Sequence, residues 1–185
     1  MENEKRRVVL DLAVTLDGFI EGENGEIDWC IMDPDMDFMS FLASVDTILY
    51  GRKSYELAES LKPGSDASDA EVVMWQLMDS KEKYVFSRTQ DHSHDNIIYI
   101  NDGIPETINR LKQQPGKDLW LYGGAELITV FINQGLIDEY RLSIHPVVLG
   151  AGKPLFGNLD ERLNLDLKDT RVFKSGVVQL IYGRD

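Results

Sequence analysis

The chain has 185 residues, a formal net charge of −13 and a single cysteine, Cys30. This length suits one domain, residues 1–185, with a sizeable core, and one cysteine excludes an intramolecular disulfide. The acidic charge argues against nucleic acid or an anionic membrane as partner. The apolar segment after the charged N-terminus is too short for a signal peptide or a membrane span. We therefore expect a cytoplasmic protein that binds a small molecule.

The first elements are a strand, a turn and a helix. Val8 to Val14 is mostly β-branched or apolar and predicts a strand, which a turn at residues 15–18 ends. Asp33-Pro34 has the composition of a helix start, and an apolar stripe with helical spacing follows it at Phe38, Phe41, Leu42 and Val45. Asp35 and Asp37 lie in the expected first turn, where complementarity to the helix dipole is enough to explain them.

Three later strands end in glycine or in hydroxyl and cationic residues. Asp46 to Tyr50 leads into Gly51-Arg52-Lys53-Ser54, Lys83 to Phe86 into Ser87-Arg88-Thr89, and Leu119 to Tyr122 into Gly123-Gly124 with a helix behind it. Cations normally avoid a helix N-terminus, so Arg52 and Lys53 favour a bound anion over a solvated pair. Gly123-Gly124 suits close approach of a phosphate, although a cramped turn would explain it too.

The rest of the chain completes the pattern. Ser68 and Glu71 have capping-box spacing, residues 97–100 predict a strand and Pro105 a helix start. Asp138 to Val148 predicts a long strand, with Pro146 implying an edge or a bulge, and a hairpin closes the chain at 172–182. His92 and His94 suit a solvated loop rather than a metal site. We expect an α/β fold with a mainly parallel sheet and an antiparallel C-terminal end.

The carboxyl ends of parallel strands lie at one edge of a sheet, so the three clusters can meet at one ligand. There is no Walker-type GxxxxGK[ST] and no GxGxxG. The chemistry indicates a dinucleotide that is held without a Rossmann fingerprint.

Five motifs in this order resemble the dihydrofolate-reductase-like superfamily, most closely stand-alone relatives of the riboflavin-biosynthesis reductase domain. They are Thr15-Leu16-Asp17-Gly18 with Trp29, the residues Gly51 to Glu56, Ser87-Arg88-Thr89, Tyr122-Gly123-Gly124, and Pro146 to Gly150. The resemblance implies a three-layer fold with helices on both faces of the sheet. It also implies a homodimer, which the long strand and the C-terminal hairpin favour independently.

The resemblance implies NADPH as cofactor. The pyrophosphate would lie between the segment Gly51, Arg52, Lys53, Ser54 and the turn Gly123, Gly124, Ala125, Glu126. Ser87, Arg88 and Thr89 would hold the 2′-phosphate, and the backbone near Ala13 with the loop from Asp17 would flank the nicotinamide.

The implied substrate contacts are Phe19, Trp29 and Tyr122. Two of these depart from the riboflavin-pathway reductases, which typically have glutamate where this chain has Tyr122 and often a cation where it has Phe19. An arginine expected late in the first helix is also absent. Dihydrofolate reductases have an acidic residue near the start of that helix, for which Asp35 is the first choice and Asp37 the second.

Two hypotheses follow. The first is an NADPH-dependent reductase of a pyrimidine- or pterin-like heterocycle, in which a carboxylate or a relayed water protonates the ring nitrogen. The second is a nucleotide- or flavin-binding protein that keeps the fold without turnover. No metal is expected in either case.

Overall fold

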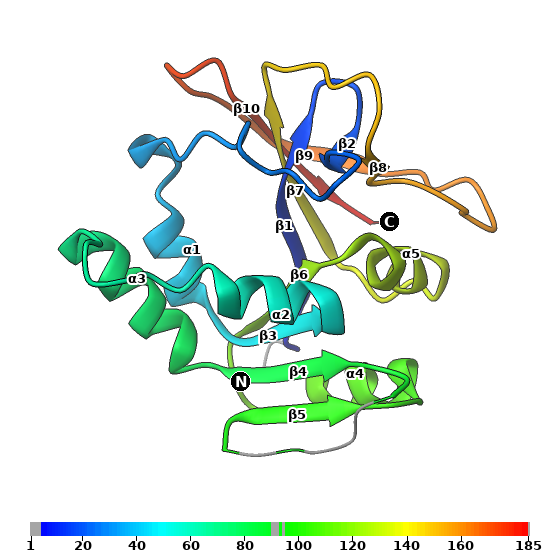
Figure 1. Cartoon of the computed structure of the whole chain (residues 1–185). Coiled ribbons are helices and arrows are strands. Elements are labelled where there is room, and N and C mark those ends of the chain that lie inside the picture. The colour runs from blue at the N-terminus through cyan, green and yellow to red at the C-terminus, as the bar shows by residue number, and fades with distance from the viewer. Residues whose placement is uncertain (1–4, 90–92, 94, 185) are drawn as a thin grey trace.

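The computed structural model describes residues 5–89, 93 and 95–184. An eight-stranded sheet with the order β5-β4-β3-β6-β1-β7-β10-β9 forms its centre (Figure 1). The strands of this sheet are β1 (Val8–Thr15), β3 (Val45–Gly51), β4 (Glu82–Phe86), β5 (Ile97–Ile100), β6 (Asp118–Gly123), β7 (Glu139–His145), β9 (Asp166–Val172) and β10 (Val178–Gly183). Two short strands, β2 (Phe19–Glu21) and β8 (Lys153–Pro154), pair separately.

Five α-helices cover the two faces of the sheet. They are α1 (Phe38–Ser44), α2 (Arg52–Ser60), α3 (Asp69–Asp79), α4 (Ile104–Lys112) and α5 (Ala125–Asn133). One core cluster joins α1, α2 and α3 to sheet residues such as Ile48 and Trp120, and the other joins α4 and α5 to residues such as Leu121. Neighbouring residues of one strand thus enter opposite cores, as the alternation of side chains in a strand requires. The expected three-layer α/β fold is confirmed.

The sheet is parallel from β5 to β7, and β10 and β9 are antiparallel. The strand expected from Asp138 to Val148, with an edge or a bulge at Pro146, is shorter than predicted. The strand β7 ends at His145, directly before Pro146, and it lies between β1 and β10 instead of at an edge. Proline lacks the N–H that a ladder position would need, so the strand stops before it. The C-terminal edge of the sheet is β9.

The segment at Asp33 also differs from the expected helix start. Asp33 and Pro34 begin a separate 3₁₀ helix, η1 (Pro34–Met36), and α1 has its own N-cap at Asp37. Asp37 has the left-handed backbone conformation, with φ 51°, so the chain bends between the two helices. Asp35 and Asp37 therefore do not share the first turn of one helix, as the sequence had suggested. The capping box of Ser68 and Glu71 is confirmed.

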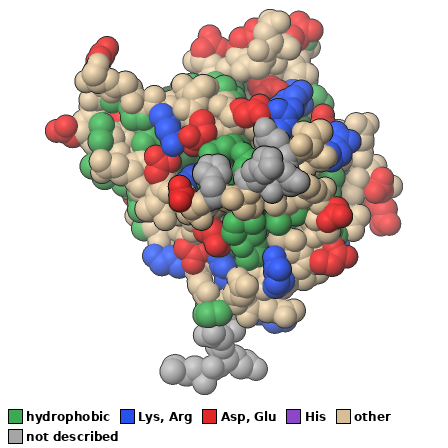
Figure 2. All heavy atoms as spheres, turned by 60° about the horizontal axis from the view of Figure 1, so that its bottom comes forward, with side chains coloured by type: hydrophobic (Ala, Val, Ile, Leu, Met, Phe, Trp, Pro, Cys, Tyr) green, Lys and Arg blue, Asp and Glu red, His purple; other side chains and the backbone are tan. Residues whose placement is uncertain are grey.

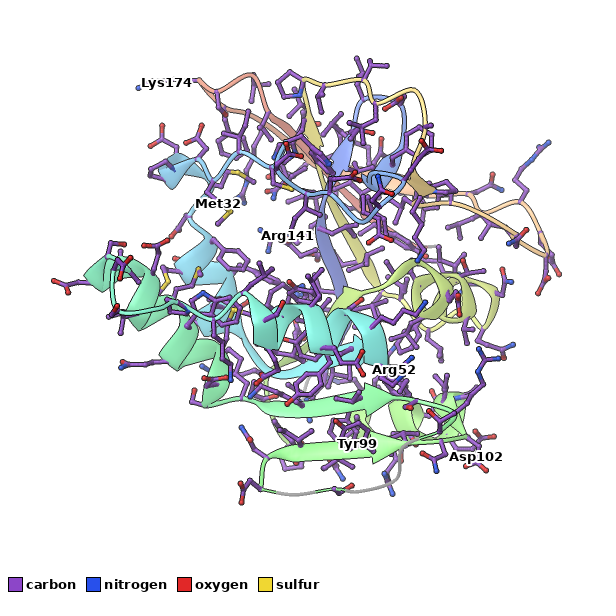
Figure 3. The ribbon with its side chains drawn as sticks, viewed as in Figure 1. Met32, Arg52, Tyr99, Asp102, Arg141 and Lys174 are labelled. Atoms are coloured by element: carbon purple, nitrogen blue, oxygen red, sulfur yellow. The ribbon has the colours of Figure 1, made fainter. Side chains whose placement is uncertain are left out.

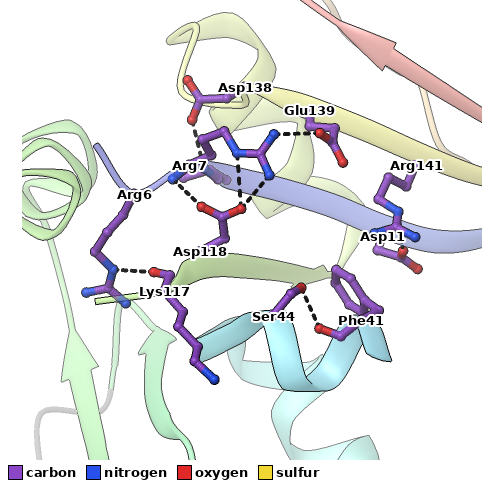
Figure 4. Close-up of polar contacts among 11 residues, drawn as sticks. Arg6, Arg7, Asp11, Phe41, Ser44, Lys117, Asp118, Asp138, Glu139 and Arg141 are labelled. Atoms are coloured by element: carbon purple, nitrogen blue, oxygen red, sulfur yellow. Dashed lines mark hydrogen bonds and ion pairs between the residues drawn. The ribbon is translucent and has the colours of Figure 1, made fainter. Parts of the chain in front are cut away.

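The strands β1, β6 and β7 are tied together at their N-terminal ends, and β1 and β6 separate toward their C-terminal ends. Arg7 binds Asp118 at 2.6 Å and Glu139 at 2.8 Å, which joins all three strands (Figure 4). Pairing of β1 with β6 stops at Leu10, whereas pairing of β1 with β7 continues to Thr15. The sheet therefore opens between β1 and β6 at the edge where the strand-end clusters lie.

Candidate functional site

A cleft of about 790 Å³ lies at the C-terminal ends of β3, β4 and β6. All three clusters that the sequence analysis singled out line it: Gly51, Arg52, Lys53 and Ser54; Ser87, Arg88 and Thr89; and Gly124, Ala125 and Glu126. Parallel strands bring these segments together although they are far apart in the chain.

The beginnings of α2 and α5 face each other across this cleft. A Cβ placed on Gly51 would lie 3.3 Å from the backbone nitrogen of Gly124, and one placed on Gly124 would lie 2.8 Å from Oγ of Ser54. Gly51 and Gly124 are the N-caps of the two helices and provide no side-chain acceptor for the first N–H groups. The peptide bond between Gly123 and Gly124 is cis. Two uncapped helix N-termini with little side-chain bulk between them form a cradle for an anionic group.

The cations of the cleft differ in how firmly they are held. Arg52 forms an ion pair with Glu56 at 2.7 Å within α2, and Lys153 forms one with Glu21 at 3.2 Å. The side chain of Arg88 is 90 % exposed and its Nη2 lies 3.9 Å from Glu126. Such a long, exposed contact holds a side chain weakly. Arg88 is therefore the arginine of the cleft that can turn toward an anionic ligand at the lowest cost.

Three expected cofactor residues do not line the cleft. The carboxylate of Asp17 accepts hydrogen bonds from Thr15 Oγ1 at 2.6 Å and from the backbone of Gly150 at 2.8 Å. These bonds, the first above all, lower the pKa of Asp17 and join the turn after β1 to the loop after β7. Ala13 lies in β1, two residues after Asp11 on the same face of the sheet, and Gly123 is the last residue of β6.

The expected substrate residues lie apart from the cleft. Phe19 pairs with Pro154 in the small sheet, and the ring of Trp29 lies edge-on to His145 at 5.4 Å. Tyr122 packs against Tyr50, with ring centroids 4.8 Å apart, and burial raises its pKa. Trp29 and Tyr122 contact other rings in this structure, and their role toward a substrate stays a prediction.

The two expected acidic residues are exposed and do not line the cleft. Asp35 lies in η1, and Asp37 accepts a hydrogen bond from the backbone of Ser40 at 3.4 Å as the N-cap of α1. Asp33 instead binds the backbone of Ser175 at 3.3 Å and so joins η1 to the turn between β9 and β10. His92 and His94 lie outside the described residues.

Sequence reasoning missed a buried carboxyl, Asp11, in the middle of β1. Its side chain is 13 % exposed and forms an ion pair with Nε of Arg141 at 3.2 Å (Figure 4). Burial raises the pKa of Asp11 to about 6, although Arg141 opposes the shift. The signal in the sequence is the single aspartate that interrupts the otherwise apolar run from Val8 to Val14.

The cleft also includes residues without a motif. Glu21 is the last residue of β2, Glu23 and Asn24 lie in the loop after it, Asn101 directly follows β5, and Lys153 belongs to β8. No single motif links these segments, so only the folded structure shows that they meet.

The described parts of the chain contain no helix long and apolar enough to cross a membrane, and no group of histidine, cysteine and acidic residues suited to a metal ion. On the face shown in Figure 2, acidic and basic side chains of the described residues are mixed, without a continuous basic surface.

Comparison with known proteins identifies the family. The model of the RibD C-terminal domain matches residues 6–179. The chain belongs to this family. It is 62 % identical over 179 residues to the uncharacterized protein YyaP of Bacillus subtilis (strain 168), covering 97 % of this chain and 95 % of YyaP.

Solved structures show the same fold at lower identity. A putative riboflavin biosynthesis protein from Shewanella sp. PV-4 has a TM-score of 0.80 at 24 % identity, covering 97 % of this chain and 99 % of that one. Dihydrofolate reductase from Enterococcus faecalis, complexed with NADP(H), has a TM-score of 0.65 at 14 % identity, covering 97 % and 96 %. The RibD C-terminal family membership and these neighbours support a reductase-like role.

Proposed function

We propose that the protein is an NADPH-dependent reductase of a pyrimidine- or pterin-like heterocycle. The observation that carries this proposal is the cleft in which the N-termini of α2 and α5 face each other beside the exposed Arg88. Two phosphates joined to each other suit two neighbouring helix N-termini, and a third phosphate suits a separate guanidinium. The fold of an NADP(H)-complexed dihydrofolate reductase supports the same cofactor.

Different residues of the cleft would hold different parts of the cofactor. The backbone at Gly51 and Gly124 would hold the pyrophosphate, and Arg88, flanked by Ser87 and Thr89, the 2′-phosphate. The nicotinamide would then lie toward Ala13, where β1 and β6 separate. When bound, NADPH supplies a hydride, which adds to carbon of a C=N bond while nitrogen takes a proton.

A carboxyl group beside the ring would supply that proton. We consider a third carboxyl group, Asp11, besides the two candidates from the sequence. Asp35 in η1 and Asp37 at the N-cap of α1 remain proposed donors. Asp11 lies one strand alternation before Ala13 on the same side of the sheet. Its pKa of about 6 leaves part of it protonated near neutral pH, as a general acid requires. We therefore place Asp11 first among the three.

The test is to follow the loss of NADPH absorbance while candidate oxidised pyrimidines and pterins are supplied at saturating cofactor. A reductase oxidises NADPH only when a substrate is present, and the amount of NADPH oxidised equals the amount of reduced product formed. The second candidate, a nucleotide- or flavin-binding protein without turnover, is favoured by the tight packing of Tyr122 against Tyr50. It predicts NADPH or flavin binding with no oxidation by any heterocycle.

A further inference from the structure

A second pocket, of about 560 Å³, lies at the N-terminal ends of β1 and β6, whereas the cleft lies at the C-terminal ends of its strands. We call it the N-terminal pocket, and five residues line it: Lys5, Arg6, Arg7, Gly116 and Asp118. Residues 5–7 lead into β1, and residues 116 and 117 lead into β6. Because these two strands pair, two segments that are distant in the sequence meet here.

Arg6 forms the buried wall of the N-terminal pocket, and its side chain is only 4 % exposed. Its Nε donates to the backbone oxygen of Lys117 (Figure 4), and its Nη2 binds Asp46 and Oγ1 of Thr47. Among the described residues, Nη1 has no hydrogen-bond partner. Nη1 carries two N–H donors, and donors that are shielded from water gain most from an ionised acceptor. Arg6 therefore offers these two donors to an anion in the pocket.

The rim of the N-terminal pocket carries two exposed cations, Lys5 and Arg7. Arg7 is already held by Asp118 at 2.6 Å and by Glu139 at 2.8 Å. Asp118 accepts from the backbone nitrogen, Nε and Nη2 of Arg7, so its charge is compensated within the chain. Lys5 forms no ion pair with any described residue. Lys5 is therefore the cation that can turn toward a ligand without breaking an existing pair.

The charge around the N-terminal pocket has the opposite sign to that of the whole chain. Five cations meet three carboxylates in and behind the pocket, which leaves +2 against −13 for the chain; they are Lys5, Arg6, Arg7, Lys81 and Lys117, and Asp46, Asp118 and Glu139. Burial above all, and then the nearby Lys117, lowers the pKa of Lys81, so the cations behind the pocket repel each other. An anion with two negative charges would balance this excess.

We propose that the N-terminal pocket binds an oxyanion of the phosphate kind. Arg6 donates to it from Nη1 on the buried side, and Lys5 from Nζ on the exposed side. Arg7 stays with Asp118 and Glu139 and keeps β1, β6 and β7 together. The pocket has room for a phosphate monoester as well as for the free ion. This site does not depend on the proposed reductase function, because it shares no residue with the cleft.

The test is a calorimetric titration of the protein with inorganic phosphate and, in parallel, with methyl phosphate. Lys5→Gln should weaken phosphate binding about tenfold, because it removes one charge-assisted hydrogen bond, and Lys5→Glu should abolish it. Lys5 is exposed, so both variants should fold as the parent does. Lys174→Gln and Lys174→Glu are the matched controls at the exposed tip of the β9–β10 hairpin (Figure 3), and they should bind phosphate like the parent.

Two further variants separate this site from the cleft, where phosphate could also bind. Gly124→Val and Arg88→Ala change the cleft alone, so both should keep the phosphate affinity of the parent. Full phosphate affinity in Lys5→Glu, loss of phosphate binding in Gly124→Val, or no binding of either probe by the parent each overturns the N-terminal pocket as an anion site. Where the site holds, binding of methyl phosphate as tight as that of inorganic phosphate assigns it to esters, and binding of inorganic phosphate alone assigns it to the free ion.

Discussion

The cleft is built differently from the polar patch, the buried cluster of Asp11, Arg141, Ser143 and Gln179. The cleft is centred on three clusters at the ends of β3, β4 and β6, and each of these clusters follows its strand directly in the sequence. The polar patch is formed by side chains from the middles of β1, β7 and β10, which meet only through strand register. A site of the first kind depends on short local segments, whereas one of the second kind depends on the pairing of strands that are distant in the sequence.

The largest effect should come from removing the proton donor. Asp11→Asn keeps the size of the side chain but cannot donate the proton, so turnover should fall by about 10²–10⁴-fold. Asp35→Asn and Asp37→Asn are matched controls, and asparagine remains a good N-cap at position 37. All three should keep their NADPH affinity. A loss of turnover in one of the controls, with full activity in Asp11→Asn, would move the acid to the start of α1.

The same assignment predicts a pH dependence. Burial raises the pKa of Asp11 to about 6, and only its protonated form can donate. Turnover should therefore fall as pH rises above about 6, while NADPH binding does not follow this profile. The residual turnover of Asp11→Asn should not show this fall with rising pH.

In the cleft, the sharpest change is Gly124→Val. A Cβ there would meet Oγ of Ser54 at 2.8 Å, and its branches would fill the space between the two helix N-termini. NADPH affinity should fall by about 100-fold or more, close to 3 kcal/mol. Gly64→Val is the control, because Gly64 has open space around its Cβ position. Circular dichroism checks that both variants fold, and fluorescence titration measures the cofactor. If Gly124→Val bound NADPH as tightly as the parent, the two helix N-termini would not be the pyrophosphate site.

A smaller and more specific effect is expected for Arg88→Ala. Losing one charge-assisted pair to the 2′-phosphate should weaken the binding of NADPH by roughly 1.5–3 kcal/mol and leave the binding of NADH nearly unchanged. The affinities for NADPH and NADH are measured by titration of the parent, of Arg88→Ala and of a control, Arg162→Ala. Arg162 is exposed and lies away from the cleft. An unchanged ratio of the two affinities would show that Arg88 does not read the phosphate.

The mildest prediction concerns assembly. The edge strand β9 exposes Leu167 and Val172, at 56 % and 76 %, and an unpaired apolar edge favours association with another copy. We expect a homodimer at micromolar concentration and a monomer for Val172→Lys, with cofactor binding intact in both. Light scattering that finds the parent monomeric would contradict this.

The sequence predicted the cleft well because its parts are local. A glycine or a hydroxyl-cation cluster directly after an apolar run can be recognised without knowing the rest of the fold, and parallel strands then bring such clusters to one edge. The same holds for the capping box at Ser68, which depends on four consecutive residues.

The sequence could not predict what depends on register or on one backbone angle. Nothing local links Asp11 to Arg141 or Ser143 to Gln179, which lie 130 and 36 residues apart. The bend at Asp37 separates η1 from α1 although the residues before and after it favour a continuous helix. Pro146 was recognised as a constraint on the strand, but it ended β7 instead of marking an edge.

The most direct test of the account is a crystal structure of the protein with NADPH bound. We predict density for the pyrophosphate between Gly51 and Gly124, the 2′-phosphate within hydrogen-bond distance of Arg88, and the nicotinamide beside Ala13 and the polar patch. Density in another place, or a cleft that stays empty at saturating NADPH, would contradict it.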